Sequence, residues 1–418
     1  MSVSLPKFAP QSQDTSVELT TLHSAHPFNV NERIQKYSQL KPRLKSGVTY
    51  LKVPSAARTK SREEIYVGTG YRGITFASEE IELIKAVFEH LDGKNSLATI
   101  AGKLGHSLGD ICAIAEELDS AGLVDTERTQ IKINERAVAH DQTSNFARDD
   151  SDGALRSLIE RIQPELELTT WYEGCRDGGV KIIHARKDFP ILIMGTQRIG
   201  VTLAALLHAS GFQSIRTYPS PVHEKSHTIT FQDICGGYIR HSDYGLAKSA
   251  LTSEMNNSIS LFPYPRNYHS HGPKPAAPSF SPRLIISIGW PTPDLLQTWM
   301  SETIPFLIVD EFTDRTFTIG PLVEPGQSAC PECIRLTLCE REPLFSFISD
   351  IRKFMPNREV PSSLAAFIAG AVSLDAISYA DCGLSDYRNS QVKYSLNELG
   401  NPQRYNWGLH PECMCHRN

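Results

Sequence analysis

The 418-residue sequence contains no apolar run long enough to span a membrane. Its longest such stretch, residues 365–374, is interrupted by Gly370 and is much shorter than the roughly 20 apolar residues that a spanning helix requires. We therefore predict a core helix there. An apolar secretory segment near the N-terminus is absent as well. These absences predict a cytoplasmic protein without a membrane partner.

A strong excess of charge of either sign is also missing, since 42 Lys and Arg residues oppose 47 Asp and Glu residues. The net charge of −5 gives no global reason to expect nucleic-acid binding. Nine cysteines without a secretory signal favour reduced thiols or a metal site over disulfides. The sequence shows no serine nucleophile elbow, no kinase or Walker motif and no paired carboxylates, so we assign no catalytic residue.

The chain is longer than one average domain, and its pattern changes along its length. Residues 1–45 are polar and aperiodic, which predicts a flexible arm. In residues 46–135, three short β-favouring runs (48–53, 64–67 and 74–76) precede three helical patterns (81–91, 97–104 and 108–121). This order predicts a small α+β winged helix-turn-helix domain. Residues 136–154 are polar and predict a linker.

Residues 155–418 show alternating strand and helix signals. A buried-strand pattern at 191–194 is followed by a glycine-containing loop, a helical pattern at 201–209 and a second strand pattern at 214–218. Further strands are predicted at 283–288 and 305–309, with a surface excursion at 262–282 between them. A strand–helix–strand order favours a mostly parallel sheet covered by helices. The predicted fold class is therefore α/β.

Four cysteines form two closely spaced pairs in the C-terminal part of the chain. Cys330 and Cys333 form a C-x-x-C motif, and Cys413 and Cys415 form a C-x-C motif. Zn²⁺ prefers four thiolate or imidazole ligands in a tetrahedron, and two such pairs supply them. With no open coordination position, the site would be structural. The alternative is a redox pair at Cys330 and Cys333 with an unordered terminal pair.

The loop after the 191–194 strand resembles a nucleotide-binding turn only in part. Gly195 and Gly200 are present, but Gln197 replaces the middle glycine of G-x-G-x-x-G. The next strand also lacks the acidic residue that would hold a ribose. The sequence therefore predicts a degenerate loop that does not bind ATP.

The third helical pattern of the winged domain contains four acidic residues and no basic one, which disfavours DNA binding. This surface is better suited to binding a peptide that adds to the edge of the sheet as an extra strand. We expect Arg72, Ile74 and Phe76 to form that edge and Ile111 and Ile114 to flank the peptide. The alternatives are that both isoleucines face the core and that Arg72 is simply solvated.

Several motifs together are similar to a known family. They are the loop at 195–200, the segment Gly-Pro-Leu-Val-Glu-Pro-Gly at 320–326 that leads to Cys330, the terminal residues 410–415, and a stretch at 91–97 followed by apolar positions up to 124. The chain resembles the cyclodehydratase partner proteins of thiazole/oxazole-modified microcin (TOMM) biosynthesis. These proteins, also called ocin-ThiF-like, join a PqqD-like RiPP recognition element to an E1-like (ThiF-type) domain.

The resemblance implies that the chain binds the leader of a ribosomally made precursor peptide and presents it to a separate YcaO-type cyclodehydratase. The YcaO partner, rather than this chain, would use ATP to form azolines in a bacteriocin-like product. The family's adenylating relatives carry a magnesium-binding aspartate where this sequence has Gly289-Trp290-Pro291. The alternative to this function is that the chain is an active ATP-dependent adenylating enzyme. A third hypothesis is that it is a winged-helix regulator. The oligomeric state, a homodimer included, is left open.

Overall fold

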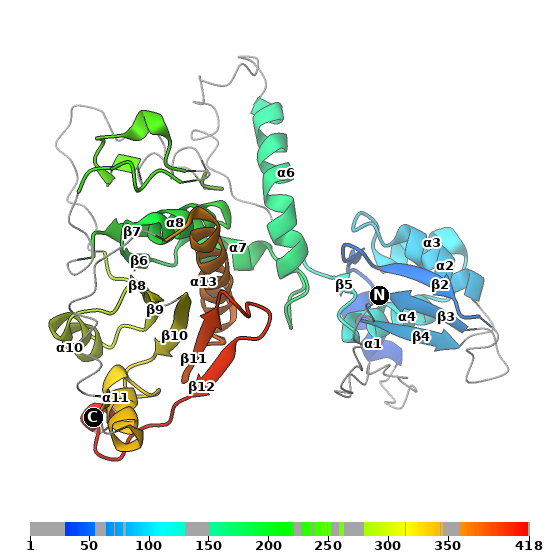
Figure 1. The fold of residues 1–418 in the computed structure, drawn as a ribbon. Helices are drawn as coiled ribbons and strands as arrows, with labels where there is room; N and C mark the ends of the chain where they lie inside the picture. Colours follow the sequence, from blue (N-terminus) through cyan, green and yellow to red (C-terminus); the bar gives the residue numbers. More distant parts are fainter. Residues whose placement is uncertain are drawn as a thin grey trace, which may run out of the picture. The chain divides into compact units, whose positions relative to one another are not determined.

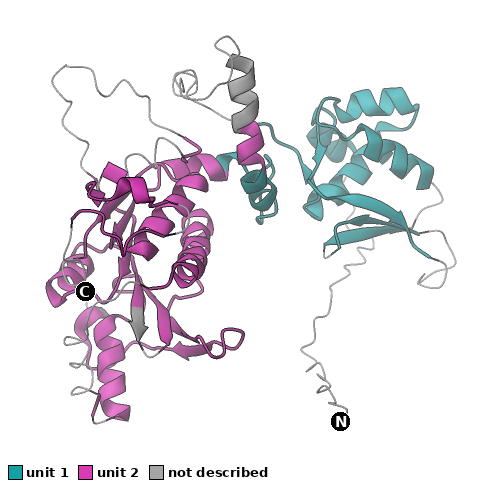
Figure 2. Cartoon of the chain, turned by 45° about the horizontal axis from the view of Figure 1, so that its top comes forward, with its two compact units in different colours: residues 1–130, 164–181 teal, residues 131–163, 182–418 magenta. Residues whose placement is uncertain are grey.

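A computed structural model of the chain describes residues 30–54, 64–70, 72–77, 81–129, 151–220, 227–235, 238–248, 250–251, 259–262, 280–313, 315–342, 344–345 and 360–416. The chain forms two compact units (Figure 2). The N-terminal unit comprises residues 1–130 and 164–181, and the C-terminal unit comprises residues 131–163 and 182–418. One boundary falls inside helix α6 (Ser151–Thr169), at its internal Pro164.

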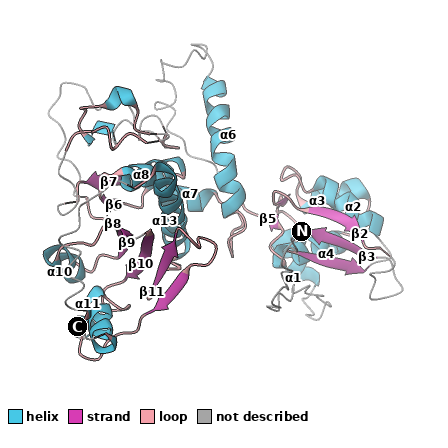
Figure 3. Cartoon of the chain, viewed as in Figure 1, coloured by secondary structure: helices cyan, strands magenta, loops and turns pink. Residues whose placement is uncertain are grey.

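The N-terminal unit combines a three-stranded antiparallel sheet with helices (Figure 3). Its elements are α1 (Val30–Tyr37), β1 (Arg43–Leu44), β2 (Thr49–Lys52), β3 (Glu64–Gly68), β4 (Gly73–Ala77), α2 (Ile81–His90), α3 (Leu97–Leu104), α4 (Leu108–Ser120) and β5 (Val124–Asp125). The sheet order is β2-β3-β4, so β4 is an edge strand, and β1 pairs separately with β5. The strands and helices predicted between residues 48 and 121 are confirmed within a few residues at each end.

Local sequence signals explain these boundaries well. The Ser96 hydroxyl accepts a hydrogen bond from the Thr99 amide and caps the start of α3. Gly105, in the left-handed conformation at φ 68°, ends the helix and donates its N–H to the Ala101 carbonyl. The apolar faces of α2, α3 and α4 then meet β3 in one core. That core includes Ile65, Val67, Ile84, Val87, Leu97, Ile100, Ile111, Cys112 and Leu118.

The prediction of a flexible arm over residues 1–45 is wrong for its C-terminal part, because residues 30–37 form α1 and residues 43–44 form β1. The Tyr37 side chain is buried, and its hydroxyl donates to an Asp119 carboxylate oxygen at 3.0 Å. Arg33 donates to Glu116 at 2.5 Å. These contacts with α4 stabilise a helix that is too short to be recognised by its own periodicity. Residues 1–29 lie outside the described residues.

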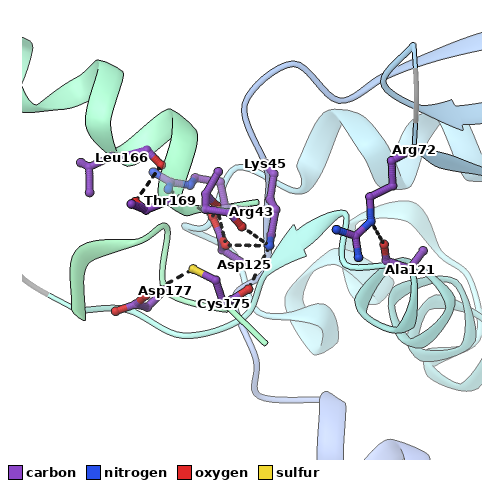
Figure 4. Close-up of polar contacts among 10 residues, drawn as sticks. Arg43, Lys45, Arg72, Ala121, Asp125, Leu166, Thr169, Cys175 and Asp177 are labelled. Atoms are coloured by element: carbon purple, nitrogen blue, oxygen red, sulfur yellow. Dashed lines mark hydrogen bonds and ion pairs between the residues drawn. The ribbon is translucent and has the colours of Figure 1, made fainter. Parts of the chain in front are cut away.

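The segment from Pro164 to Lys181 packs with the N-terminal unit, although the sequence assigned it to the second domain. The buried Lys45 amine donates to the Cys175 carbonyl at 2.9 Å (Figure 4). It also donates to the Thr170 carbonyl at 2.5 Å. The Thr170 hydroxyl in turn donates to Asp125. Burial lowers the pKa of Lys45, and the Asp125 carboxylate opposes that shift. Residues 136–150 of the predicted linker lie outside the described residues, and residues 151–154 begin α6.

The C-terminal unit is built on a seven-stranded sheet (Figure 1). Its strands are β6 (Ile191–Met194), β7 (Ile215–Tyr218), β8 (Leu284–Ile288), β9 (Phe306–Thr313), β10 (Thr316–Val323), β11 (Ser390–Ser395) and β12 (Gln403–Asn406). The order is β12-β11-β10-β9-β8-β6-β7. The strands β7, β6, β8 and β9 are parallel, whereas β10, β11 and β12 are antiparallel additions. The predicted α/β class and the four predicted strands are confirmed. Most of the predicted excursion at 262–282 lies outside the described residues.

Helices cover both faces of this sheet. The helices of the unit include α7 (Val180–Lys187), α8 (Arg198–Ala209), α10 (Pro293–Ser301), α11 (Pro331–Arg341) and α13 (Ser362–Cys382). In β8, Leu284, Ile286 and Ile288 share a core with α8 and α13, whereas Ile285 joins the core that contains Trp299 of α10. The alternation follows from the two-residue period of a strand.

Contrary to the expectation from the sequence, helix α13 is long and apolar enough by length and composition to cross a membrane, the one such helix in the part of the chain that the structure describes. Half of its most apolar window is buried inside the protein. Ile368, Ala369, Val372 and Ala376 are fully buried in the core shared with α8. This confirms the predicted core helix at 365–374.

A buried ion pair also fixes α13. The Arg186 guanidinium on α7 donates to the Asp381 carboxylate at 2.6 and 2.8 Å, with both side chains at most 1% exposed. Another Arg186 nitrogen donates to the Ser210 carbonyl at 2.9 Å.

Candidate functional site

The four predicted metal ligands come together in the C-terminal unit. Cys330 immediately precedes α11, and Cys333 lies in its first turn. Pro331, at the first helical position, suits that turn because its fixed φ is already helical. Cys413 precedes the short 3₁₀ helix η5 (Met414–His416), and Cys415 lies within it. The start of α11 and the C-terminal segment of the chain therefore meet at one cluster.

The sulfur positions have the spacing of a tetrahedral thiolate site. All four Sγ atoms lie within 4.8 Å of one another. The measured separations are 3.8 Å for Cys330–Cys333, 3.6 Å for Cys330–Cys413 and 3.5 Å for Cys333–Cys415. A tetrahedron with metal–sulfur bonds of 2.3 Å has sulfur–sulfur edges of about 3.8 Å. The cluster could therefore bind a metal ion.

Burial makes the charge of this cluster unfavourable without a cation. Cys330, Cys333 and Cys413 are buried among apolar side chains that include Trp299 and Trp407. Burial raises the pKa of Cys330 to about 12. At Cys333, burial is the largest single effect and raises the pKa, but hydrogen bonds from the backbone and from neighbouring thiols outweigh it and lower the value. A divalent cation would compensate four thiolates in this environment.

A turn at His410 positions the terminal cysteine pair. The Cys413 amide donates to the His410 carbonyl at 3.0 Å, and the Glu412 amide donates to His410 Nδ1 at 3.2 Å. His410 is itself buried. Such outer contacts orient metal ligands. The sequence analysis did not single out this role of His410, and the spacing alone carried no signal for it.

The glycine loop lies at the point where the order of the parallel strands reverses, because β6 has β7 on one side and β8 on the other. Ligands of open α/β sheets bind at such points. Gly195 has φ 138°, and a Cβ on Gly200 would lie 2.0 Å from the Gly195 carbonyl oxygen. Gly200 is therefore required by the close approach of α8 to the end of β6, and Gly195 is required by its positive φ and by its close contact with Ile288 of β8.

Gln197 makes this loop a poor nucleotide site. It is the N-cap of α8 and is 7% exposed, yet its side chain makes no capping hydrogen bond. Neither its amide nitrogen nor its amide oxygen has a hydrogen-bond partner within the described chain. A Cβ on Gly195 would lie 2.6 Å from Gln197 Oε1, so the amide folds back over the loop. The Gln197 side chain therefore lies beside the N-terminus of α8, where the glycine of a nucleotide loop would leave room for phosphates, and the residues present do not fit the ATP site of a G-x-G-x-x-G loop.

The residues expected to form a peptide-binding edge are only partly exposed. Arg72 precedes β4 and is exposed, and its Nε donates to the Ala121 carbonyl at 3.1 Å (Figure 4). Ile74 is buried in the core, and Phe76 is partly buried against it. Ile111 is fully buried, which agrees with the alternative that it faces the core, and it has no exposed surface that a peptide could contact.

Ile114, in contrast, is partly buried and keeps an exposed surface. Asp110, Ile114, Glu117 and Ala121 are spaced by four, three and four residues, so they follow one stripe along α4 and its C-cap. We call these four residues the open stripe. Its last member contacts Arg72 at the start of β4. The open stripe therefore runs toward the edge of the sheet at β4, which pairs with only one strand, β3, among the described residues. The sequence analysis missed Glu117, although its spacing from Ile114 could have indicated it.

No protein-family model and no curated protein matches the sequence. Solved structures do match. The E. coli MccB complex with AMPCPP and MccA is 15% identical with a TM-score of 0.55, and the match covers 90% of this chain and 99% of that chain. MccB with ATP is also 15% identical, at a TM-score of 0.54 and the same coverage. The chain has an E1-like fold. A third match, the microcin C7 biosynthetic enzyme MccB with N-formylated MccA, is 14% identical at a TM-score of 0.54, with the same coverage of both chains.

Proposed function

We propose that this chain binds the leader of a ribosomally made precursor peptide and presents that peptide to a separate YcaO-type cyclodehydratase. The observation that supports this most directly is the outer edge of β4, which pairs with no strand among the described residues and toward which the open stripe of α4 runs. An edge strand offers unpaired backbone N–H and C=O groups, and an extended peptide can use them as an added strand.

The comparisons support a peptide as the substrate class. Solved MccB structures that share this fold contain MccA. The amide of Gln197 over the glycine loop favours a binding role for this chain, with ATP used by the partner. That partner would close Cys, Ser or Thr side chains of the core peptide onto the preceding backbone carbonyl. Each closure forms an azoline with the net loss of water.

Zinc is the metal that we assign to the cysteine cluster. Four soft thiolates at tetrahedral spacing favour Zn²⁺ and disfavour Mg²⁺ or Ca²⁺, which prefer oxygen ligands. Cys330, Cys333, Cys413 and Cys415 would fill every coordination position. The role of zinc is then structural, holding the C-terminal segment to α11.

Leader binding can be tested by fluorescence anisotropy with the full chain and the labelled leader encoded beside its gene. Ile114→Asp should weaken binding by about 1–3 kcal/mol, because it places an unpaired polar group against the peptide. Leu51→Asp is the matched control, since Leu51 is an exposed apolar residue on the opposite edge strand β2. Unchanged affinity in an Ile114→Asp protein with wild-type circular dichroism would place the leader elsewhere.

Presentation requires a second experiment. The YcaO protein encoded nearby, the precursor peptide and Mg-ATP should give azoline products, detected by mass as successive losses of water, only when this chain is added. Azoline formation at the same rate without this chain contradicts the proposed role.

The second candidate is an adenylating enzyme that acts on a peptide carboxylate. It is favoured by the retained Gly195 and Gly200 and by the fold shared with the MccB–ATP structure. ATP–pyrophosphate exchange catalysed by this chain and the precursor peptide alone would select this candidate over the first.

A further inference from the structure

The charges on α4 are divided between two sides of the helix. Glu116 accepts a hydrogen bond from Arg33 at 2.5 Å. Asp119 accepts one from the Tyr37 hydroxyl at 3.0 Å and lies 3.3 Å from an Arg176 nitrogen. These two carboxylates are therefore neutralised within the N-terminal unit.

The two carboxylates of the open stripe have no such partners among the described residues. Within the described part of the chain, neither Asp110 nor Glu117 has a hydrogen bond or salt bridge. Asp110 is exposed near the start of α4, where the helix dipole favours an acid. Glu117 is partly buried, one turn before Ala121 and its contact with Arg72. Burial, and then the Glu116 carboxylate, raise the pKa of Glu117, whereas the charge of Arg33 lowers it by a smaller amount.

We propose that the recognised peptide carries an aliphatic residue followed two positions later by a lysine or arginine, read by Ile114 and Glu117 respectively. This inference rests on the proposed function and specifies the chemistry of its ligand. Ile114 and Glu117 are separated by about 4.5 Å along the helix axis. Side chains two positions apart on a strand share a face and are separated by about 6.6 Å. One extended segment along β4 can therefore place both side chains against the open stripe.

Charge complementarity selects this occupant. An anionic segment would meet two unpaired carboxylates on the open stripe, and like charges in a partly buried contact are unfavourable. An ammonium or guanidinium group would instead give Glu117 a charge-assisted hydrogen bond that no described residue supplies. Arg72, at the end of the stripe, already donates to Ala121 and leaves Glu117 available.

The test uses the full chain and fluorescein-labelled peptides of Thr and Ser that contain Leu and, two positions later, Lys, Gln or Glu. The wild-type chain should bind the Lys peptide about tenfold more tightly than the Glu peptide. Glu117→Gln should remove most of this preference, and Glu117→Lys should reverse it. Glu89→Gln, which changes an exposed glutamate on α2, is the control and should keep the wild-type preference.

Binding without a charge preference, or a preference that Glu117→Lys leaves unchanged, overturns the inference and leaves peptide recognition intact. The inference is likewise overturned, and peptide recognition retained, if the encoded leader binds while every library peptide fails. If neither the leader nor any library peptide binds, the proposed function is overturned together with the inference.

Discussion

The cysteine cluster allows the most quantitative prediction. Replacing Cys413 and Cys415 together by serine should release one zinc ion per chain and detach the C-terminal segment from α11. Two of the four thiolate ligands would remain, and Zn²⁺ sites of this class require four. Cys382→Ser is a matched control, because Cys382 is an exposed cysteine of the same unit outside the cluster.

The expected loss of stability follows from the length of chain that the metal closes. Cys330 and Cys413 are 83 residues apart in sequence and their sulfurs are 3.6 Å apart. Treating the metal as a cross-link, the chain-entropy relation for a loop of that size gives about 4–5 kcal/mol. This is a large part of the stability of an ordinary domain, about 5–15 kcal/mol.

Two measurements check this prediction. Elemental analysis of the purified wild-type protein should give one zinc per chain, and the double serine variant should give none. Urea unfolding followed by tryptophan fluorescence should show the loss of stability, since Trp299 and Trp407 lie in the core around the cluster. Wild-type protein without zinc, or a double variant that unfolds at the same urea concentration as Cys382→Ser, would refute the reasoning.

Three further predictions concern the C-terminal unit. Calorimetric titration of the full chain with Mg-ATP should show no micromolar binding, and such binding to the wild type would contradict the prediction. Gln197→Gly should not restore ATP binding, because the residues that would hold the ribose and the magnesium ion are missing as well. Burial lowers the pKa of His208 from 6.5 to about 4. The contribution of the neutral imidazole to the free energy of unfolding is therefore complete above pH 6.5, and about 3 kcal/mol of it is lost as the pH falls to 4. Between pH 6.5 and 4, the free energy of unfolding in urea should fall by about 3 kcal/mol less in His208→Gln than in the wild type. Burial raises the pKa of Asp375 to about 6 and has the opposite effect on stability, but this effect is the same in both proteins and cancels in the comparison. Equal pH dependence in the two proteins would show that His208 does not cause the loss of stability. Finally, Asp381→Asn should lower the free energy of unfolding by about 3–5 kcal/mol, because it leaves the buried Arg186 charge uncompensated; a change below 1 kcal/mol in thermal and urea unfolding would show that Arg186 is solvated.

Sequence patterns predicted best where the decisive interactions are local. Ser96 and Gly105 bound α3 through contacts within one helical turn, and the prediction of residues 97–104 is confirmed without error. In contrast, β10 was missed because Gly320 and Pro321 lie inside it and are unfavourable in strands. A shift in register between Ile319 and Leu322 accommodates them, and only pairing with β9 and β11 reveals it.

The sequence by itself determined the four candidate metal ligands, because thiolate chemistry and close spacing identify them wherever the chain runs. It also determined that the glycine loop is incomplete. The tertiary structure decided that the amide of Gln197 covers this loop and that Ile111 belongs to the core. Among the described residues, it also left Glu117 without a cationic partner, because Arg33 pairs with the neighbouring Glu116 carboxylate, 83 residues further along the chain. Such pairings are decided by contacts between distant segments, which no local pattern encodes.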